Sequence, residues 1–153
     1  MNVTKNLILH QPQERNKTTI PPMKIKMWIE RGAILQNTVI EPSVMWNFTN
    51  HMNMKSVNKP FCIPLMDINR ITSVLTIDRE VFPFAKTKLS FIVTSSSHGR
   101  YLFEARSEKE KNIVVRNLKL IIARLASQAF LNNSDILQDY FQDTTPLFEN
   151  YET

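Results

Sequence analysis

Apolar and polar residues alternate in short runs from residue 23 onward, and this period of two predicts β-strands with one buried face. In the run 23–30, Ile25, Met27 and Ile29 alternate with polar residues, and Gly32 follows where a bend is expected. Residues 33–35 are expected to continue this strand. Similar runs predict the remaining strands at 38–40, 44–48, 61–65, 67–74, 89–94 and 100–105.

The pattern changes to a helical one after the last predicted strand. Residues 95–99, Ser-Ser-Ser-His-Gly, predict the turn of a hairpin that joins the last two strands. Ser107 and Glu110 have the capping-box spacing of a helix start, and no proline or glycine occurs between Ser107 and Phe130. We therefore predict one long helix over 107–130. Its core stripe follows a 3.6-residue period at Val114, Leu118, Ile121, Ile122, Leu125 and Ala129.

The two ends of the chain differ from this central part. Residues 1–22 are mostly polar, contain only the short apolar run Leu7-Ile8-Leu9 and end in Pro21-Pro22, so we expect a flexible lead-in. Residues 132–153 predict an acidic tail with one short helix. A single folded domain at 23–131 fits a chain of 153 residues.

Several strands followed by one long C-terminal helix predict an α+β fold. The run Tyr101-Leu102-Phe103-Glu104-Ala105, followed by Ser107-Glu108-Lys109-Glu110, resembles the last strand and helix start of pleckstrin-homology-like (PH-like) domains. The run Ile63-Pro64-Leu65-Met66-Asp67-Ile68 resembles the I-P-L-x-x-I strand of the same family, including its GRAM type. The chain also resembles uncharacterised PH-like proteins of unicellular algae. The resemblance implies a bent seven-stranded antiparallel β-barrel that is capped by the C-terminal helix.

Phosphoinositide-binding members of that family carry basic residues across the first hairpin. Lys24, Lys26 and Arg31 match the first half of this arrangement, but residues 36–48 contain no Lys or Arg. High-affinity recognition of an inositol phosphate needs several convergent donors, and the second half of this arrangement is missing from the chain.

Composition excludes several classes of function. Gly32 and Gly99 are the only glycines, whereas phosphate-cradling loops need several closely spaced glycines. The single cysteine, Cys62, excludes an internal disulfide and a multi-cysteine zinc site, and its apolar neighbours predict a buried thiol. The three histidines lack a metal-ligand spacing, and no nucleophile, base and orienting residue are suitably spaced. We therefore expect a non-catalytic protein without a metal or cofactor.

The net charge of +5 conceals an asymmetry along the chain. Residues 1–124 hold all nineteen Lys and Arg with nine acids, a net charge of +10, while residues 125–153 hold five acids and no Lys or Arg. A basic body favours an anionic partner, unless the charges form no single patch. Aromatic residues are not interleaved with the cations, which disfavours nucleic acid. The candidate anion- or lipid-binding residues are Lys24, Lys26, Arg31, Lys55, Lys59, Lys86, Lys88 and Arg100.

Two further surfaces follow from the pattern. In the tail, Asp135, Asp139 and Asp143 recur every fourth residue; the tail either folds back onto the basic body and competes with an outside anion, or it is disordered or merely packed. On the long helix, apolar residues outside the core stripe form either a partner-docking face or a face covered by another segment of the chain. These candidate docking residues are Ile113, Leu120 and Phe130.

The sequence therefore supports two functions. The first is a non-catalytic protein-interaction or scaffold domain with a protein partner of unknown identity. The alternative is weak peripheral binding to anionic phospholipid or phosphoinositide membranes through the basic surface. The sequence contains no signal-peptide core or membrane-spanning run, so we expect a cytoplasmic protein, held at a membrane surface under the second interpretation.

Overall fold

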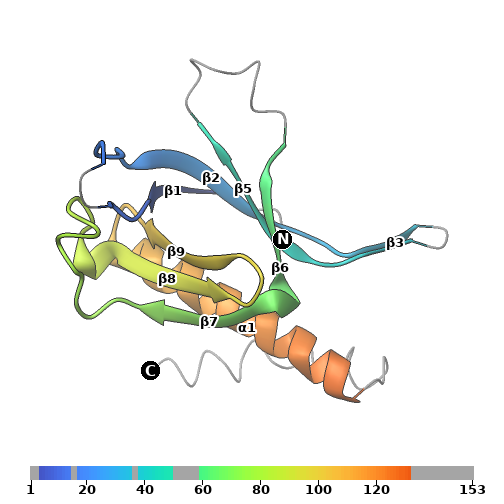
Figure 1. Cartoon of the computed structure of the whole chain (residues 1–153). Helices are drawn as coiled ribbons and strands as arrows, with labels where there is room; N and C mark the ends of the chain where they lie inside the picture. Colours follow the sequence, from blue (N-terminus) through green and yellow to red (C-terminus); the bar gives the residue numbers. More distant parts are fainter. Residues whose placement is uncertain (1–3, 15–16, 36–37, 50–58, 132–153) are drawn as a thin grey trace.

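The computed structural model describes residues 4–14, 17–35, 38–49 and 59–131, which fold around one antiparallel sheet (Figure 1). The alternating runs found in the sequence form most of its strands, because alternation gives each strand one apolar face for the core. In sheet order the seven strands are β6 (Phe61–Pro64), β5 (Ser43–Phe48), β2 (Met23–Glu30), β1 (Lys5–His10), β9 (Gly99–Glu104), β8 (Ser90–Ser95) and β7 (Ile68–Ser73).

One long helix, α1 (Glu108–Leu131), caps this sheet. It packs on β7 and β8 and on two short 3₁₀ helices, η2 (Leu65–Asp67) and η3 (Thr87–Leu89). The helix starts as predicted, because the Ser107 Oγ accepts a hydrogen bond from the Glu110 N–H at 3.1 Å. The α+β class with a C-terminal capping helix is confirmed, and it is consistent with a PH-like fold.

The sheet is not closed into a barrel, so that part of the expectation is wrong. Strands β6 and β7 occupy the two edges of the sheet, and no ladder joins them. They are connected through η2 instead, which turns the chain between the two edges. Pro64 ends β6 and has no N–H to donate, which removes one hydrogen bond that a closing ladder would need.

The expectation of a flexible lead-in is wrong for Lys5–His10. These residues form β1, which pairs with both β2 and β9 in the middle of the sheet. Leu7 and Leu9 point into the core and are 4% and 5% exposed. The apolar run was too short to predict a strand on its own, and its pairing with two distant strands supplies the missing stability.

Two local predictions are also corrected. Residues 33–35 do not extend β2; they form β3 (Ala33–Leu35), which pairs only with β4 (Thr38–Ile40) in a separate two-stranded hairpin. The thiol of Cys62 is exposed rather than buried. Because side chains alternate along β6, the burial of Ile63 places its neighbour Cys62 on the outer face.

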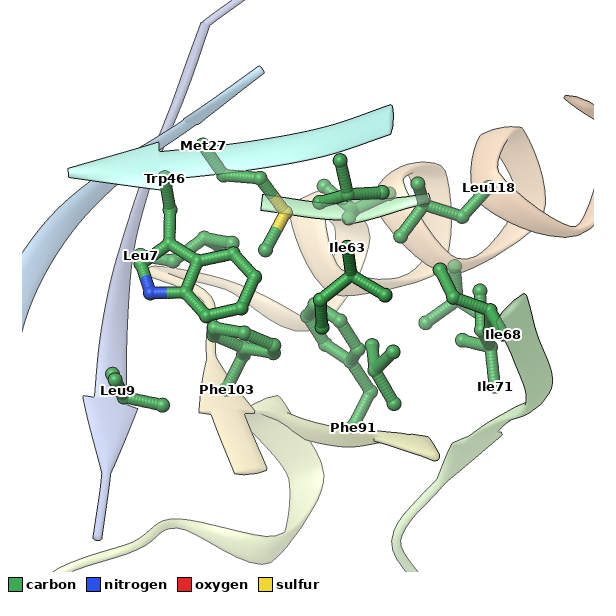
Figure 2. Packing of buried hydrophobic residues seen from close by; sticks show 14 of the residues in the cluster. Leu7, Leu9, Met27, Trp46, Ile63, Ile68, Ile71, Phe91, Phe103 and Leu118 are labelled. Atoms are coloured by element: carbon green, nitrogen blue, oxygen red, sulfur yellow. The ribbon is translucent and has the colours of Figure 1, made fainter. Parts of the chain in front are cut away.

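The core lies between the inner face of the sheet and α1 (Figure 2). Its centre is aromatic: the Trp46 ring meets the Tyr101 and Phe103 rings edge to face, at centroid distances of 5.1 and 5.4 Å. Leu118 of α1 is 3% exposed and faces the same core. The outer face of the sheet is therefore the one available for binding.

Candidate functional site

A row of side chains crosses the outer face of the sheet at β2, β1 and β9. Lys24 pairs with Ile8, and Ile8 pairs in turn with Glu104. Ile25, the next residue after Lys24, is fully buried, so the alternation of β2 directs Lys24 and Lys26 away from the core. Strand register thus brings together residues that are about eighty positions apart in the sequence.

This row borders a shallow hollow of about 470 Å³, which we call the basic hollow. Its wall includes Asn6 and Ile8 of β1, and its charged lining residues are Lys24, Lys86, Glu104 and Arg106. Three cations and one carboxylate leave a net charge of +2 at neutral pH. The side chains of all three cationic residues are exposed.

Glu104 is held below these cations by two polar contacts. Its Oε1 accepts a hydrogen bond from the Lys86 backbone N–H at 2.9 Å and lies 3.1 Å from the His10 Nε2. His10 and Glu104 are both buried, so this pair is shielded from solvent. Among the described residues, no carboxylate forms an ion pair with Lys24, Lys86 or Arg106. The hollow therefore presents three cationic groups without an ion-pair partner among the described residues, and a net charge of +2, to an incoming anion.

The structure separates the basic residues that the sequence singled out. Lys24 and Lys86 line the basic hollow, Lys26 follows on the same face of β2, and Lys88 lies in η3. Arg31, Lys59 and Arg100 do not join them. Arg31 follows the far end of β2, Lys59 precedes β6, Arg100 pairs with Thr94 beside the β8–β9 turn, and Lys55 lies outside the described residues.

Arg106 is the cationic residue of the hollow that sequence reasoning missed. It stands between the last strand and the Ser107 cap, where no pattern distinguishes it from an ordinary linker residue. Asn6 was missed for a different reason, because its segment was taken as a flexible lead-in. The pairing of β1 with β2, which places Asn6 opposite Lys26, could not be found from local periodicity.

A second polar cluster surrounds the β8–β9 turn. Ser95 Oγ donates to Asp67 Oδ2 at 2.7 Å, and Ser97 Oγ donates to Asp67 Oδ1 at 3.1 Å. The His98 Nδ1 lies 3.1 Å from Asp67 Oδ2 and 3.4 Å from Ser95 Oγ. Hydrogen bonds from Ser95 and His98 lower the pKa of the Asp67 carboxyl below its ordinary value of 3.8.

This cluster is not arranged for nucleophilic catalysis. In a serine nucleophile the hydroxyl and the carboxylate contact opposite nitrogens of the histidine ring. Here Ser95 and Asp67 both contact Nδ1, and the hydroxyl donates directly to the carboxylate. The cluster holds the turn against η2 and does not activate the hydroxyl.

The predicted docking residues of α1 are only partly available. Ile113 and Leu120 are half-buried, and the side chain of Phe130 lies outside what the structure describes. Ile113 borders a hollow of about 540 Å³ on the first turns of α1. The polar residues that line it are Glu108, Lys109, Asn112 and Arg116.

No group of three or more His, Cys, Asp or Glu side chains within the described ranges is placed to hold a metal ion. No helix in these ranges is long and apolar enough to cross a membrane.

Comparison with known proteins gives no further identification. No protein-family model matches the chain, and no curated protein matches its sequence.

Proposed function

We propose that this chain is a non-catalytic binding module that recognises phosphate-bearing anions, such as the headgroups of anionic phospholipids, in the basic hollow. The observation that carries the proposal is the convergence of Lys24, Lys86 and Arg106 on one concave surface without a carboxylate partner among the described residues. Arginine binds phosphate through two parallel N–H donors, and lysine binds it as a point charge.

The shallowness of the hollow favours weak, salt-sensitive binding. Three exposed cations on an open surface act in a high dielectric, and their attraction is screened within a Debye length of about 10 Å at 0.1 M salt. Such a module would act in the cytoplasm, at the inner surface of a membrane whose lipids supply many headgroups at once. The PH-like resemblance of residues 101–110 agrees with a binding role but does not identify the ligand.

Protein docking is the second candidate function, and the hollow beside Ile113 on α1 supports it. Addition of a partner strand at the β6 edge of the sheet is less favoured. The free edge strand β6 has only four residues and is bracketed by Pro60 and Pro64, which donate no backbone hydrogen bond. A protein partner would therefore use the helix in preference to this sheet edge.

The test compares vesicles of phosphatidylcholine with vesicles that also contain phosphatidylserine, by sedimentation at two salt concentrations. Lys24→Gln, Lys86→Gln and Arg106→Gln should each weaken binding to the acidic vesicles about fivefold, since a basic residue near such a surface contributes about 1 kcal/mol. Glu104→Gln should strengthen this binding by a similar factor. The substitution removes the negative charge but keeps a side-chain oxygen that can accept the hydrogen bond from the Lys86 backbone N–H.

Lys119→Gln is the matched control, because it removes the same charge from an exposed position on α1. It should leave binding nearly unchanged. If Lys119→Gln weakens binding as much as Lys24→Gln, the attraction is spread over the whole basic body and the hollow is not the site.

A further inference from the structure

Two large apolar side chains protrude from the connection between β7 and β8, residues 74–89. Leu75 is 90% exposed and Phe84 is 52% exposed. Phe61, which is 45% exposed on β6, stacks on the Trp46 ring at 5.6 Å, so its position is explained by packing. Leu75 is almost wholly in water, and exposed apolar side chains that gather into one patch are typical of a surface that meets a partner.

The connection that carries them is hydrogen-bonded near both residues. Directly before Leu75, the Val74 N–H donates to the Ser90 carbonyl at 3.3 Å. The Phe82 N–H donates to the Asp78 carbonyl at 2.8 Å, and the Arg79 guanidinium donates to the Ala85 carbonyl and the Thr87 hydroxyl. Ala85 itself is 1% exposed, which anchors the segment directly after Phe84. The protein holds these apolar groups outward at some cost in hydration.

A third exposed apolar residue is tied to the same end of the molecule. Gln13, in the β1–β2 connection, donates its backbone N–H to the Val81 carbonyl at 2.8 Å. The Gln13 side chain then forms two hydrogen bonds with the backbone of Ile20. Its Nε2 donates to the Ile20 carbonyl and its Oε1 accepts from the Ile20 N–H, each at 2.7 Å. Ile20 is 37% exposed. We call Ile20, Leu75 and Phe84 the apolar tip; both connections lie at the left of Figure 1.

Two cations lie close to Phe84 along the same connection. Lys86 and Lys88 follow Phe84 by two and four residues, both are exposed, and neither forms an ion pair with a carboxylate of the described residues. Asp78 lies on the same connection, but its carboxylate accepts from the Glu80 N–H at 2.9 Å and so closes its own turn. This hydrogen bond does not remove the charge of Asp78, and Glu80 lies on the connection too. With Arg79, Lys86 and Lys88, residues 74–89 carry a net charge of +1, so the connection combines exposed apolar groups with a small positive excess.

We propose that the apolar tip inserts into an anionic lipid bilayer, with Leu75 and Phe84 among the acyl chains and Lys86 and Lys88 at the headgroups. A bilayer fits both features, because it offers an apolar interior directly below a layer of negative charge. Lys86 also lines the basic hollow, so a lipid bound there would lie next to the inserted side chains. This inference extends the proposed function, since it places the hollow on a membrane.

The experiment measures partition onto vesicles of phosphatidylcholine and phosphatidylserine. Leu75→Ser and Phe84→Ser should each weaken partition about tenfold, because each removes an apolar side chain that leaves water on insertion. Met66→Ser is the matched control: Met66 is 46% exposed but lies in η2, outside the tip. Unchanged partition of both tip variants, or an equal loss for Met66→Ser, would overturn insertion.

A fluorescence measurement reports insertion directly and does not depend on how well each variant binds. In a Cys62→Ser background, which removes the exposed native thiol, an environment-sensitive dye is attached through Leu75→Cys or Met66→Cys. The dye at position 75 should shift to the blue on the acidic vesicles, and the dye at position 66 should not. An aqueous spectrum at position 75 on vesicles that carry bound protein would contradict the proposal.

The two proposals can fail separately. Soluble dihexanoyl phosphatidylserine, below the concentration at which it forms micelles, probes the basic hollow without a bilayer. If it binds the wild-type protein more tightly than Lys24→Gln, and both Leu75→Ser and Phe84→Ser still partition normally, headgroup recognition stands and insertion is wrong. If Lys24→Gln changes nothing while Leu75→Ser loses partition, insertion stands and the hollow is wrong.

Discussion

Asp67 uses both carboxylate oxygens to hold the β8–β9 turn against η2. Ser95 and Ser97 donate hydroxyl groups to it, and the Ser97 N–H also reaches Oδ2 at 3.3 Å. The turn needs this support because Gly99 adopts a φ of +83°, a left-handed conformation that L side chains rarely take. One carboxylate thus connects the strand pair β8–β9 to the corner of the sheet.

Asp67→Asn should destabilise the fold at neutral pH and have little effect in acid. The pKa of Asp67 is lowered in the folded state, so its contribution is fully present above the ordinary value of 3.8 and is lost as pH falls through the lower folded value. Urea unfolding at neutral pH and near pH 3 measures the difference.

The matched control for that substitution is Asp78→Asn, which also removes a carboxylate but lies outside the turn cluster. It should not reproduce the same pH dependence. A constant difference in unfolding free energy between wild type and Asp67→Asn at both pH values would contradict the role given to the Asp67 charge.

At the scale of elements, α1 is the part that completes the core. Val114, Val115 and Leu118 are each no more than 6% exposed, and the helix covers η2 and β7 at one edge of the sheet. Its start is set by Ser107, whose hydroxyl accepts the Glu110 N–H. Because α1 follows β9 after three residues, its starting position also determines where Arg106 lies relative to the basic hollow.

Ser107→Ala should lower the free energy of unfolding by about 1 kcal/mol, the usual loss when a capping hydroxyl is removed from a helix start. Chemical unfolding followed by circular dichroism measures it. Ser107→Asp keeps an oxygen acceptor at the same position and should retain most of the stability. Equal stability of Ser107→Ala and the wild type would show that the hydroxyl contributes nothing as a cap.

At the scale of the whole molecule, positive and negative charge are divided along the chain. The described body carries the basic hollow and the apolar tip, while the acidic residues 135–152 lie outside the described residues. An acidic segment tethered to a basic surface competes with outside anions at a high effective concentration. The hypothesis that the acidic tail shields the basic body can therefore be tested by measuring how tightly the protein binds acidic vesicles with and without the tail.

Deletion of residues 133–153 should strengthen binding to acidic vesicles severalfold, and the gain should shrink at high salt because screening weakens the attraction between tail and body. Vesicle sedimentation at two salt concentrations measures it. In a full-length variant, Asp135→Asn, Asp139→Asn and Asp143→Asn together should reproduce part of the gain. Unchanged binding in both variants would rule out shielding.

The strands and the helix that were predicted well are those whose own sequence carries a clear pattern of apolar and polar residues. Residues 23–30 alternate over a full strand length, and the run from Ser107 has both a cap and a long apolar stripe. Lys5–His10 shows why other parts failed. Its six residues contain too little alternation to be distinguished from a polar lead-in, and the partners that stabilise them come from β2 and β9.

The candidate site was likewise predictable only in part: composition pointed to some of its residues, and the fold decided which of them lie together. Lys24 and Lys86 could be chosen from composition, because the excess of basic residues is visible in the chain. Their grouping with Arg106, and the separation of Arg31 and Arg100 from them, depends on strand register.

The amino-acid sequence alone established the α+β class, the long capped helix and a basic body with few glycines. These follow from periodicity and composition, which act over neighbouring residues. The open sheet, the central place of β1, the basic hollow and the exposed position of Leu75 came only from the folded molecule. Each of them depends on which distant segments pair or cover one another, and that is set by packing across the whole chain.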